Sequence, residues 1–158
     1  MKKLLFLLLS SLVAAAPLTA QDAPKPAQPP AHKQKKEKER PDTDIEKAMK
    51  KMGGAFRKLR GQAKAGAFTS DAVDLVATMK AAATEAAKHD PLKTKEIPEA
   101  DRAKFVADYK AKMDEFNTTL DSLTAALKAG QTADAVALVG KLGKLQHGGH
   151  EEFQPKDY

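Results

Sequence analysis

Two pairs of side chains in this sequence have the spacing and chemistry of metal ligands. Met49 and Met52 carry thioether sulfurs, and His147 and His150 carry imidazole rings. On a helix this spacing places both members of a pair on one face, a single turn apart. Thioether and imidazole together suit copper, in particular Cu(I). One hypothesis is therefore a copper-binding protein that uses all four residues.

Glycines accompany the two histidines near the end of the chain. Gly143, Gly148 and Gly149 lie in a segment that otherwise has the pattern of a helix, where each glycine costs about 1 kcal/mol relative to alanine. Either the helix has frayed at residues 148 and 149, or its backbone needs space beside it. We favour space for a flat cofactor that His150 ligates.

Composition excludes several classes of protein. The chain has 158 residues and no cysteine, which excludes disulfides, thiolate metal sites and haem attached through a Cys-x-x-Cys-His motif. The formal charge of +6 falls to +2 over residues 43–158, with 19 basic and 17 acidic residues. We see no basic face with interleaved aromatic residues, so we expect no nucleic-acid partner. No nucleophile–base pair or paired carboxylate stands out, so we do not expect an enzyme.

The first 42 residues have the composition of a leader and a spacer. Residues 1–20 combine two lysines, an apolar run and a small residue, Ala20, at the expected cleavage position; this is the pattern of a bacterial signal peptide and predicts a periplasmic protein. The run is too short for a stable membrane anchor. Residues 21–42 are rich in Pro and Lys and predict a disordered linker, most simply a solvated spacer.

Residues 43–155 have the pattern of a helical domain. The predicted helices cover residues 43–66, 70–89, 98–130 and 132–154, with a capping box formed by Thr43 and Glu46 and with Thr132 as the cap of the last helix. Glycine-containing loops join the first to the second helix and the third to the fourth. Because short loops make antiparallel neighbours, the predicted fold is all-α, an antiparallel up-down-up-down four-helix bundle.

In such a bundle the first helix begins beside the end of the fourth. Met49 lies about 9 Å in from Thr43, and His150 lies about 7.5 Å from Pro155, at 1.5 Å per residue. The two side chains are therefore expected at a similar depth, with Phe56 and Phe153 walling the same region. The predicted inner face of the fourth helix comprises Val136, Val139, Gly143, Gln146, His150 and Phe153.

The two ends of this domain carry a family resemblance. The stretch Asp44-Ile45-Glu46-Lys47-Ala48-Met49, together with His150 eight residues after Leu142, resembles the first and last helices of the cytochrome b562 family, periplasmic bundles that hold haem noncovalently through Met and His. The last turns are also similar to those of cytochrome c′, whose two haem-bonding cysteines are replaced here by Gln146 and Gly149. The resemblance implies haem b with Met49 and His150 as axial ligands, beside Phe56, Gln146, Gly149 and Phe153.

The resulting functional hypothesis is a periplasmic b-type cytochrome that carries one electron to or from a redox partner. Two alternatives stay open at this point. One is a haem-free bundle that acts as a binding or stress-response module. The other is the copper-binding bundle that uses Met49, Met52, His147 and His150.

Overall fold

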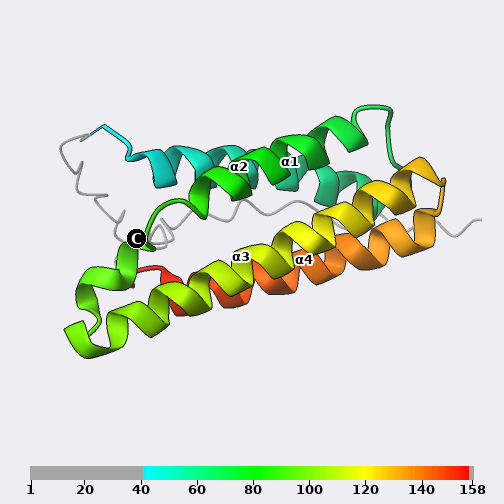
Figure 1. Cartoon of the computed structure of the whole chain (residues 1–158). Coiled ribbons are helices and arrows are strands. Elements are labelled where there is room, and N and C mark those ends of the chain that lie inside the picture. Colours follow the sequence, from blue (N-terminus) through cyan, green and yellow to red (C-terminus); the bar gives the residue numbers. More distant parts are fainter. Residues whose placement is uncertain (1–40, 157–158) are drawn as a thin grey trace, which may run out of the picture. The chain divides into compact units, whose positions relative to one another are not determined.

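Four α-helices and one short 3₁₀-helix form the part of the chain that the computed structural model describes, residues 41–156 (Figure 1). The predicted signal peptide and nearly all of the predicted linker lie outside the described residues. All regular elements of the described residues are helices, which confirms the predicted all-α class. The elements are α1 (Asp44–Ala65), α2 (Ala72–Ala86), η1 (Leu92–Glu96), α3 (Glu99–Lys128) and α4 (Thr132–Phe153).

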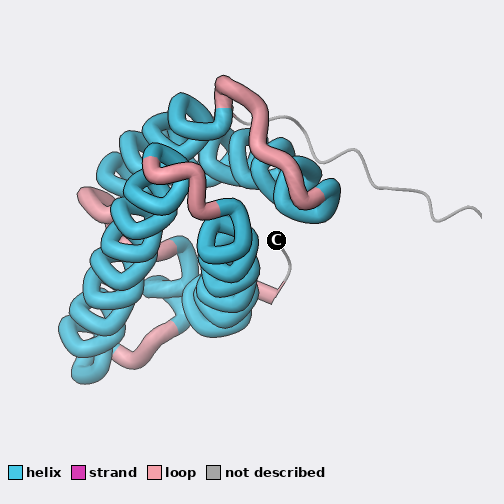
Figure 2. Tube along the Cα trace, turned by 90° about the vertical axis from the view of Figure 1, so that its right-hand side faces the viewer, coloured by secondary structure: helices cyan, strands magenta, loops and turns pink. Residues whose placement is uncertain are grey.

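Successive helices run in opposite directions, which confirms the predicted up-down-up-down bundle (Figures 1 and 2). Each helix packs against the next along the chain, and α4 returns to pack against α1. Within residues 41–156 the diagonal pairs do not approach closely at the level of the backbone. α1 packs much less closely on α4 than on α2. We call the line along which α1 meets α4 the α1–α4 seam; it includes the start of α1 and the end of α4, which lie at the same end of the bundle.

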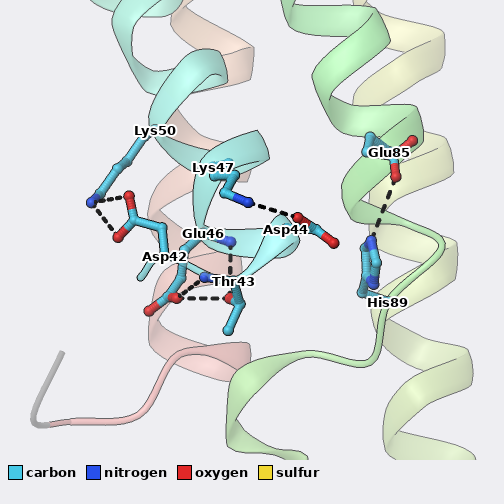
Figure 3. A network of polar contacts seen from close by, with 8 residues as sticks. All are labelled: Asp42, Thr43, Asp44, Glu46, Lys47, Lys50, Glu85 and His89. Carbon is cyan, nitrogen blue, oxygen red and sulfur yellow. Dashed lines mark hydrogen bonds and ion pairs between the residues drawn. The ribbon is translucent and has the colours of Figure 1, made fainter. Parts of the chain in front are cut away.

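The start of α1 is fixed by the predicted capping box (Figure 3). The backbone N–H and the hydroxyl of Thr43 donate hydrogen bonds to Oε2 of Glu46 at 2.6 and 2.7 Å. The N–H of Glu46 donates in return to the Thr43 hydroxyl at 3.4 Å. An ion pair of 2.7 Å between Lys50 and Asp42 ties the residue before the cap to the following turn. These contacts therefore hold the first turn of α1 in place at the end of the bundle where α1 begins and α4 ends.

Hydrogen bonds stabilise the short connection between α1 and α2. Gly66 ends α1 in the left-handed region, at φ 66°, where glycine has no steric penalty. The side chain of Gln62 donates to Asp71 at 2.9 Å and accepts from the Thr69 N–H at 3.2 Å. Hydrogen bonds from Thr69 and Gln62 hold the pKa of Asp71 below its usual value. Gly130, at φ 68°, serves the same purpose between α3 and α4.

The fourth helix begins at a different cap from the predicted one. Gln131 is the N-cap, Thr132 is the first helical residue, and the Gln131 side chain makes no capping hydrogen bond. The helix is continuous through Gly148 and Gly149 as far as Phe153. The alternative that the helix frays at these glycines is therefore wrong.

The buried face of α4 is also rotated relative to the prediction. Its buried side chains are Ala135, Val139, Leu142 and Phe153, whereas Val136, Gly143 and Gln146 are only partly buried and His150 is exposed. The reason is that α4 packs mainly on α3 and much less on α1. The predicted inner face, apart from Val139 and Phe153, is thereby turned toward the α1–α4 seam.

The capping box provides a test of the local structure. We expect Thr43→Ala to lower the free energy of unfolding by about 1 kcal/mol, because the N–H groups of the first turn lose their side-chain partner. Thr132→Ala is the matched control: it replaces a first-turn threonine that is not a cap, and it should change stability by less than about 0.5 kcal/mol. Urea denaturation followed by circular dichroism measures both. Equal losses in the two variants would contradict this assignment of caps.

Candidate cofactor-binding cavity

A mainly apolar cavity of about 320 Å³ lies where α1 begins and α4 ends. Its volume is within the range of about 300–1,000 Å³ that is typical of small-molecule sites. Side chains of α1, α3 and α4 and the residues around the start of η1 form its wall. The apolar part of that wall consists of Ile45, Met49, Met52, Phe56, Pro91, Leu92, Tyr109, Met113, Phe116, Leu145 and Phe153.

All six residues that the sequence singled out for the site lie on the wall of this one cavity. Met49 and Phe56 come from α1, and Gln146, Gly149, His150 and Phe153 come from α4. A thioether and an imidazole thus face one cavity from two different helices. Such a pair can ligate the metal of a planar cofactor from two sides. That either residue is a ligand stays a prediction at this point.

His150 lies at the rim of the cavity and not on the inner face of α4, as the sequence had suggested. Its side chain is exposed, while Met49 is partly buried. The loose packing at the seam and the absence of side chains on Gly148 and Gly149 leave the imidazole uncovered. A Cβ at Gly149 would meet no heavy atom of the described chain within 4 Å. The α4 side of the cavity mouth is therefore open.

Phe56 and Gly143 meet at the boundary of the cavity. A Cβ built on Gly143 would lie 3.9 Å from the Cζ of Phe56. The ring of Phe56 is almost fully buried, and the guanidinium of Arg60 lies 5.7 Å from its centroid, within the range of a cation–π contact. A Cβ at this position would make an ordinary van der Waals contact with the ring, so Phe56 does not by itself require a glycine at position 143.

Phe153, on the wall of the cavity, packs against two aromatic rings of α3. Phe153 lies 5.2 Å from Phe105 and 5.3 Å from Tyr109, measured between ring centroids. These separations are typical of favourable tilted and edge-to-face pairs. At the same end, the ammonium of Lys93 donates a hydrogen bond of 3.0 Å to the backbone carbonyl of Glu152. The last turn of α4, which carries His150, is therefore held by both α3 and η1.

Tyr109 is a buried polar group on the wall of the cavity. Its hydroxyl donates a hydrogen bond of 3.2 Å to the backbone carbonyl of Ala86 in α2. Burial raises the pKa of Tyr109 to about 12, because the low-dielectric surroundings disfavour the charged phenolate. The hydroxyl therefore stays protonated over the whole physiological range.

One buried carboxylate also faces the cavity. Glu46 is only 5% exposed, and it accepts the two hydrogen bonds from Thr43 described above. Charge-assisted hydrogen bonds of this kind offset part of the cost of burying an acid. The capping box of α1 is thus also part of the cavity wall.

Sequence reasoning missed the contribution of the second connection and of α3. Pro91 and Leu92 line the cavity, although the sequence suggested only a loose connection at this place. Tyr109, Met113 and Phe116 of α3 also line the cavity, and they are not among the predicted site residues. Their spacing of three or four residues was the available signal; it could not show that these residues face a cavity.

The four residues of the copper hypothesis are not brought into one cavity. Met49, Met52 and His150 line the cavity, but His147 does not. Its side chain is 77% exposed and pairs with Glu151, with 3.4 Å between Nε2 and Oε1. Among the described residues, no group of three or more His, Cys, Asp or Glu side chains could hold a metal ion. Nothing in this arrangement favours the copper hypothesis.

The comparison with protein families gives a match that covers most of the chain. The model of the family described as cytochrome b562 matches residues 44–154, from the first residue of α1 to the residue after α4. No curated protein matches the chain significantly. Over the described residues, every helix is too short or too polar to cross a membrane.

The burial of Tyr109 gives a prediction for alkaline pH. A phenol with a folded-state pKa of about 12 and an unfolded value near 10 stabilises the fold fully below pH 10, and this contribution is lost as the pH rises from about 10 to 12. In that window the free energy of unfolding should fall by up to about 1.4 kcal/mol per pH unit through this group.

Tyr109→Phe should be less stable than the wild type by about 1 kcal/mol at pH 7, because the hydrogen bond to Ala86 is lost. The difference should shrink above pH 10, because phenylalanine does not ionise. Urea denaturation of both proteins between pH 7 and 12 measures this, with lysine titration common to the two. A difference that stays constant with pH would contradict the assignment.

Gly148 allows a test of which glycines the site needs. It is exposed, it does not line the cavity, and a Cβ there would meet no described heavy atom within 4 Å. We expect Gly148→Ala to raise the free energy of unfolding by about 0.5–1 kcal/mol, because alanine is the better helix former. Cofactor affinity should not change. A loss of stability, measured by urea denaturation, would show that this position needs a glycine.

Proposed function

Because the chain belongs to the cytochrome b562 family, we propose that it is a b-type cytochrome that binds haem noncovalently in the cavity and carries one electron. Met49 and His150 would hold the haem iron. The observation that carries this proposal is the position of both residues on the wall of a single cavity, one from the first helix and one from the last. The family match supports haem as the cofactor, and the lining of the cavity supports Met49 and His150 as its ligands.

The residues of the cavity fit a haem group. The wall is apolar and aromatic over most of its area, and Gly53 and Gly149 leave space on the sides of α1 and α4. A thioether and an imidazole are established axial ligands of haem iron. With no cysteine in the sequence, there is no thioether linkage to the vinyl groups, so noncovalent contacts must retain the cofactor.

The protein's own residues determine the environment of the cofactor. The buried rings of Phe56, Tyr109 and Phe153 exclude water and lower the local dielectric. A thioether at Met49 favours the reduced state and raises the potential. The carboxylate of Glu46 on the same wall acts in the opposite direction, because a negative charge favours the oxidised state. Haem itself, when bound, supplies the one-electron chemistry.

The location and partner of the protein follow from the same hypothesis. The leader at residues 1–20, which is outside the described part, supports export to the periplasm. There the protein would exchange electrons with a redox partner. The proposed role is that of an electron carrier, as membership of the cytochrome b562 family implies.

Two substitutions test the ligands. We expect His150→Ala to lower haem affinity by more than about tenfold, or 1.4 kcal/mol, because the imidazole is the stronger ligand. Met49→Ala should keep more haem but change the spin state, because one axial position loses its ligand. Haem titration of the apo-protein, followed by the Soret and visible bands, measures both effects.

The matched controls are Met52→Leu and His147→Ala. Met52 lines the same cavity but is not a proposed ligand, and His147 is exposed outside it. Both variants should keep the spectrum of the wild type. If neither Met49→Ala nor His150→Ala changes the spectrum, the ligand assignment is wrong. If the wild type shows no Soret band after haem is added, the protein is a haem-free bundle.

A further inference from the structure

An open groove runs along the α1–α4 seam beside the cavity, and most of its lining residues are not part of the cavity wall. The groove has a volume of about 1,080 Å³. Its cationic side chains are Arg57, Arg60 and Lys64 of α1 and Lys144 of α4, with His147 at the same wall. No acidic residue of the described chain is part of its lining. We call this feature the basic groove.

The basic groove reflects a segregation of charge that the composition conceals. Over their whole lengths α1 and α4 contain nine basic and five acidic residues, and all five acids lie near the helix ends, outside residues 47–65 and 135–150. α2 and α3 together contain six basic and eight acidic residues. The nearly balanced charge of residues 43–158 therefore hides one strongly positive side, which sequence analysis did not detect.

Glycines make the groove concave between its charged walls. A Cβ would meet no described heavy atom within 4 Å at three of them, which leaves the floor open. Arg60 is partly held in place by its contact with the ring of Phe56. A planar guanidinium pairs with a carboxylate through two parallel hydrogen bonds. The glycines that line the groove are Gly53, Gly61, Gly140 and Gly143.

The groove and the cavity share part of their walls. Gly53, Phe56, Gln146 and His150 line both. A molecule seated in the groove therefore lies directly against the side chain of the proposed ligand His150. This is the position that a partner must take to exchange an electron with a cofactor in the cavity.

We propose that the basic groove docks an acidic, carboxylate-bearing face of a redox partner protein. The proposal rests on the proposed haem function for its purpose but not for the binding itself. Complementary charge raises the rate of encounter and selects the partner, and both effects weaken as salt increases. The open mouth at His150 then makes the docked partner the nearest electron donor or acceptor.

Two other anionic partners suit the groove less well. Single-stranded nucleic acid needs exposed aromatic rings on which bases stack, but Phe56, the aromatic residue in this lining, is only 2% exposed. An anionic bilayer is broad and cannot enter a concave groove, and polybasic membrane-binding segments present their charges on the outside. A protruding acidic side of a protein can enter.

The test compares two triple variants of the full chain that change the net charge equally. The first variant reverses the charge of the groove with Arg57→Glu, Lys64→Glu and Lys144→Glu. Lys95→Glu, Lys110→Glu and Lys128→Glu reverse exposed cations of η1 and α3 that do not line it. Fluorescence anisotropy with labelled poly-L-glutamate measures binding with and without haem. Poly(U) RNA and vesicles containing phosphatidylserine serve as competitors, and thermal melts show that both variants fold.

We expect the groove variant to bind poly-L-glutamate at least about tenfold more weakly than the wild type, and the control variant to stay within about twofold. Equal losses would overturn the proposal, because they would show an effect of net charge alone. Tighter binding of poly(U) or of vesicles through the groove would also overturn it. So would loss of peptide binding on haem loading, which would mean that the haem carboxylates occupy the groove.

A second readout links the groove to electron transfer. In the reduced, haem-loaded protein, oxidation by ferricyanide should be slower in the groove variant than in the control variant. Oxidation by the cationic tris(phenanthroline)cobalt(III) should be faster. Equal rates in the two variants would overturn the role in electron transfer. If the protein binds no haem, the anisotropy result still decides whether the groove binds carboxylates, so the two proposals fail separately.

Discussion

The loose packing of α1 on α4 is the feature on which the site depends. The other neighbouring helices are closely packed, and small residues such as Ala82, Ala83 and Ala86 let α2 approach its neighbours. Along the α1–α4 seam the two helices are packed less closely. A cavity therefore forms on the inner side of the seam and a groove on its outer side. An empty apolar cavity lowers the stability of the fold, because the side chains of its wall lack van der Waals partners on one side. A ligand that binds only the folded state restores stability by mass action.

Much of the fold could be predicted from the sequence because its signals are local. The Thr43–Glu46 capping box, the left-handed glycines Gly66 and Gly130 and the apolar stripes each depend on residues within a few turns of one another. The similar depth of Met49 and His150 in the bundle could be predicted from the rise per residue and the antiparallel order of the helices alone. That is why six predicted site residues lie on one cavity wall.

Other features could not be predicted because they depend on how the helices are rotated and on what lies between them. Pro91 and Leu92 line the cavity from a connection that has no periodicity. The buried face of α4 centres on Leu142 because α3 is its main neighbour, and a stripe in the sequence does not specify its neighbour. The basic groove was missed because the summed charge of a domain says nothing about which helix carries it.

The glycines of α4 have three different surroundings in one continuous helix. Gly143 lies next to the ring of Phe56, Gly149 lines the cavity, and Gly148 is exposed and does not line the cavity. A Cβ would cause no close contact with the described residues at any of the three. The helix persists in spite of them because packing against α3 and the bond from Lys93 to Glu152 hold its last turns.

The site joins the first helix of the domain to the last, so its two proposed ligands lie about a hundred residues apart in the sequence. During synthesis Met49 is made before His150, and the cavity lacks its α4 wall until the residues of α4 have been added. No partial chain can assemble it. A cofactor held there would link the first helix of the domain to the last, and it would bind only chains in which α1 and α4 have both folded and packed together.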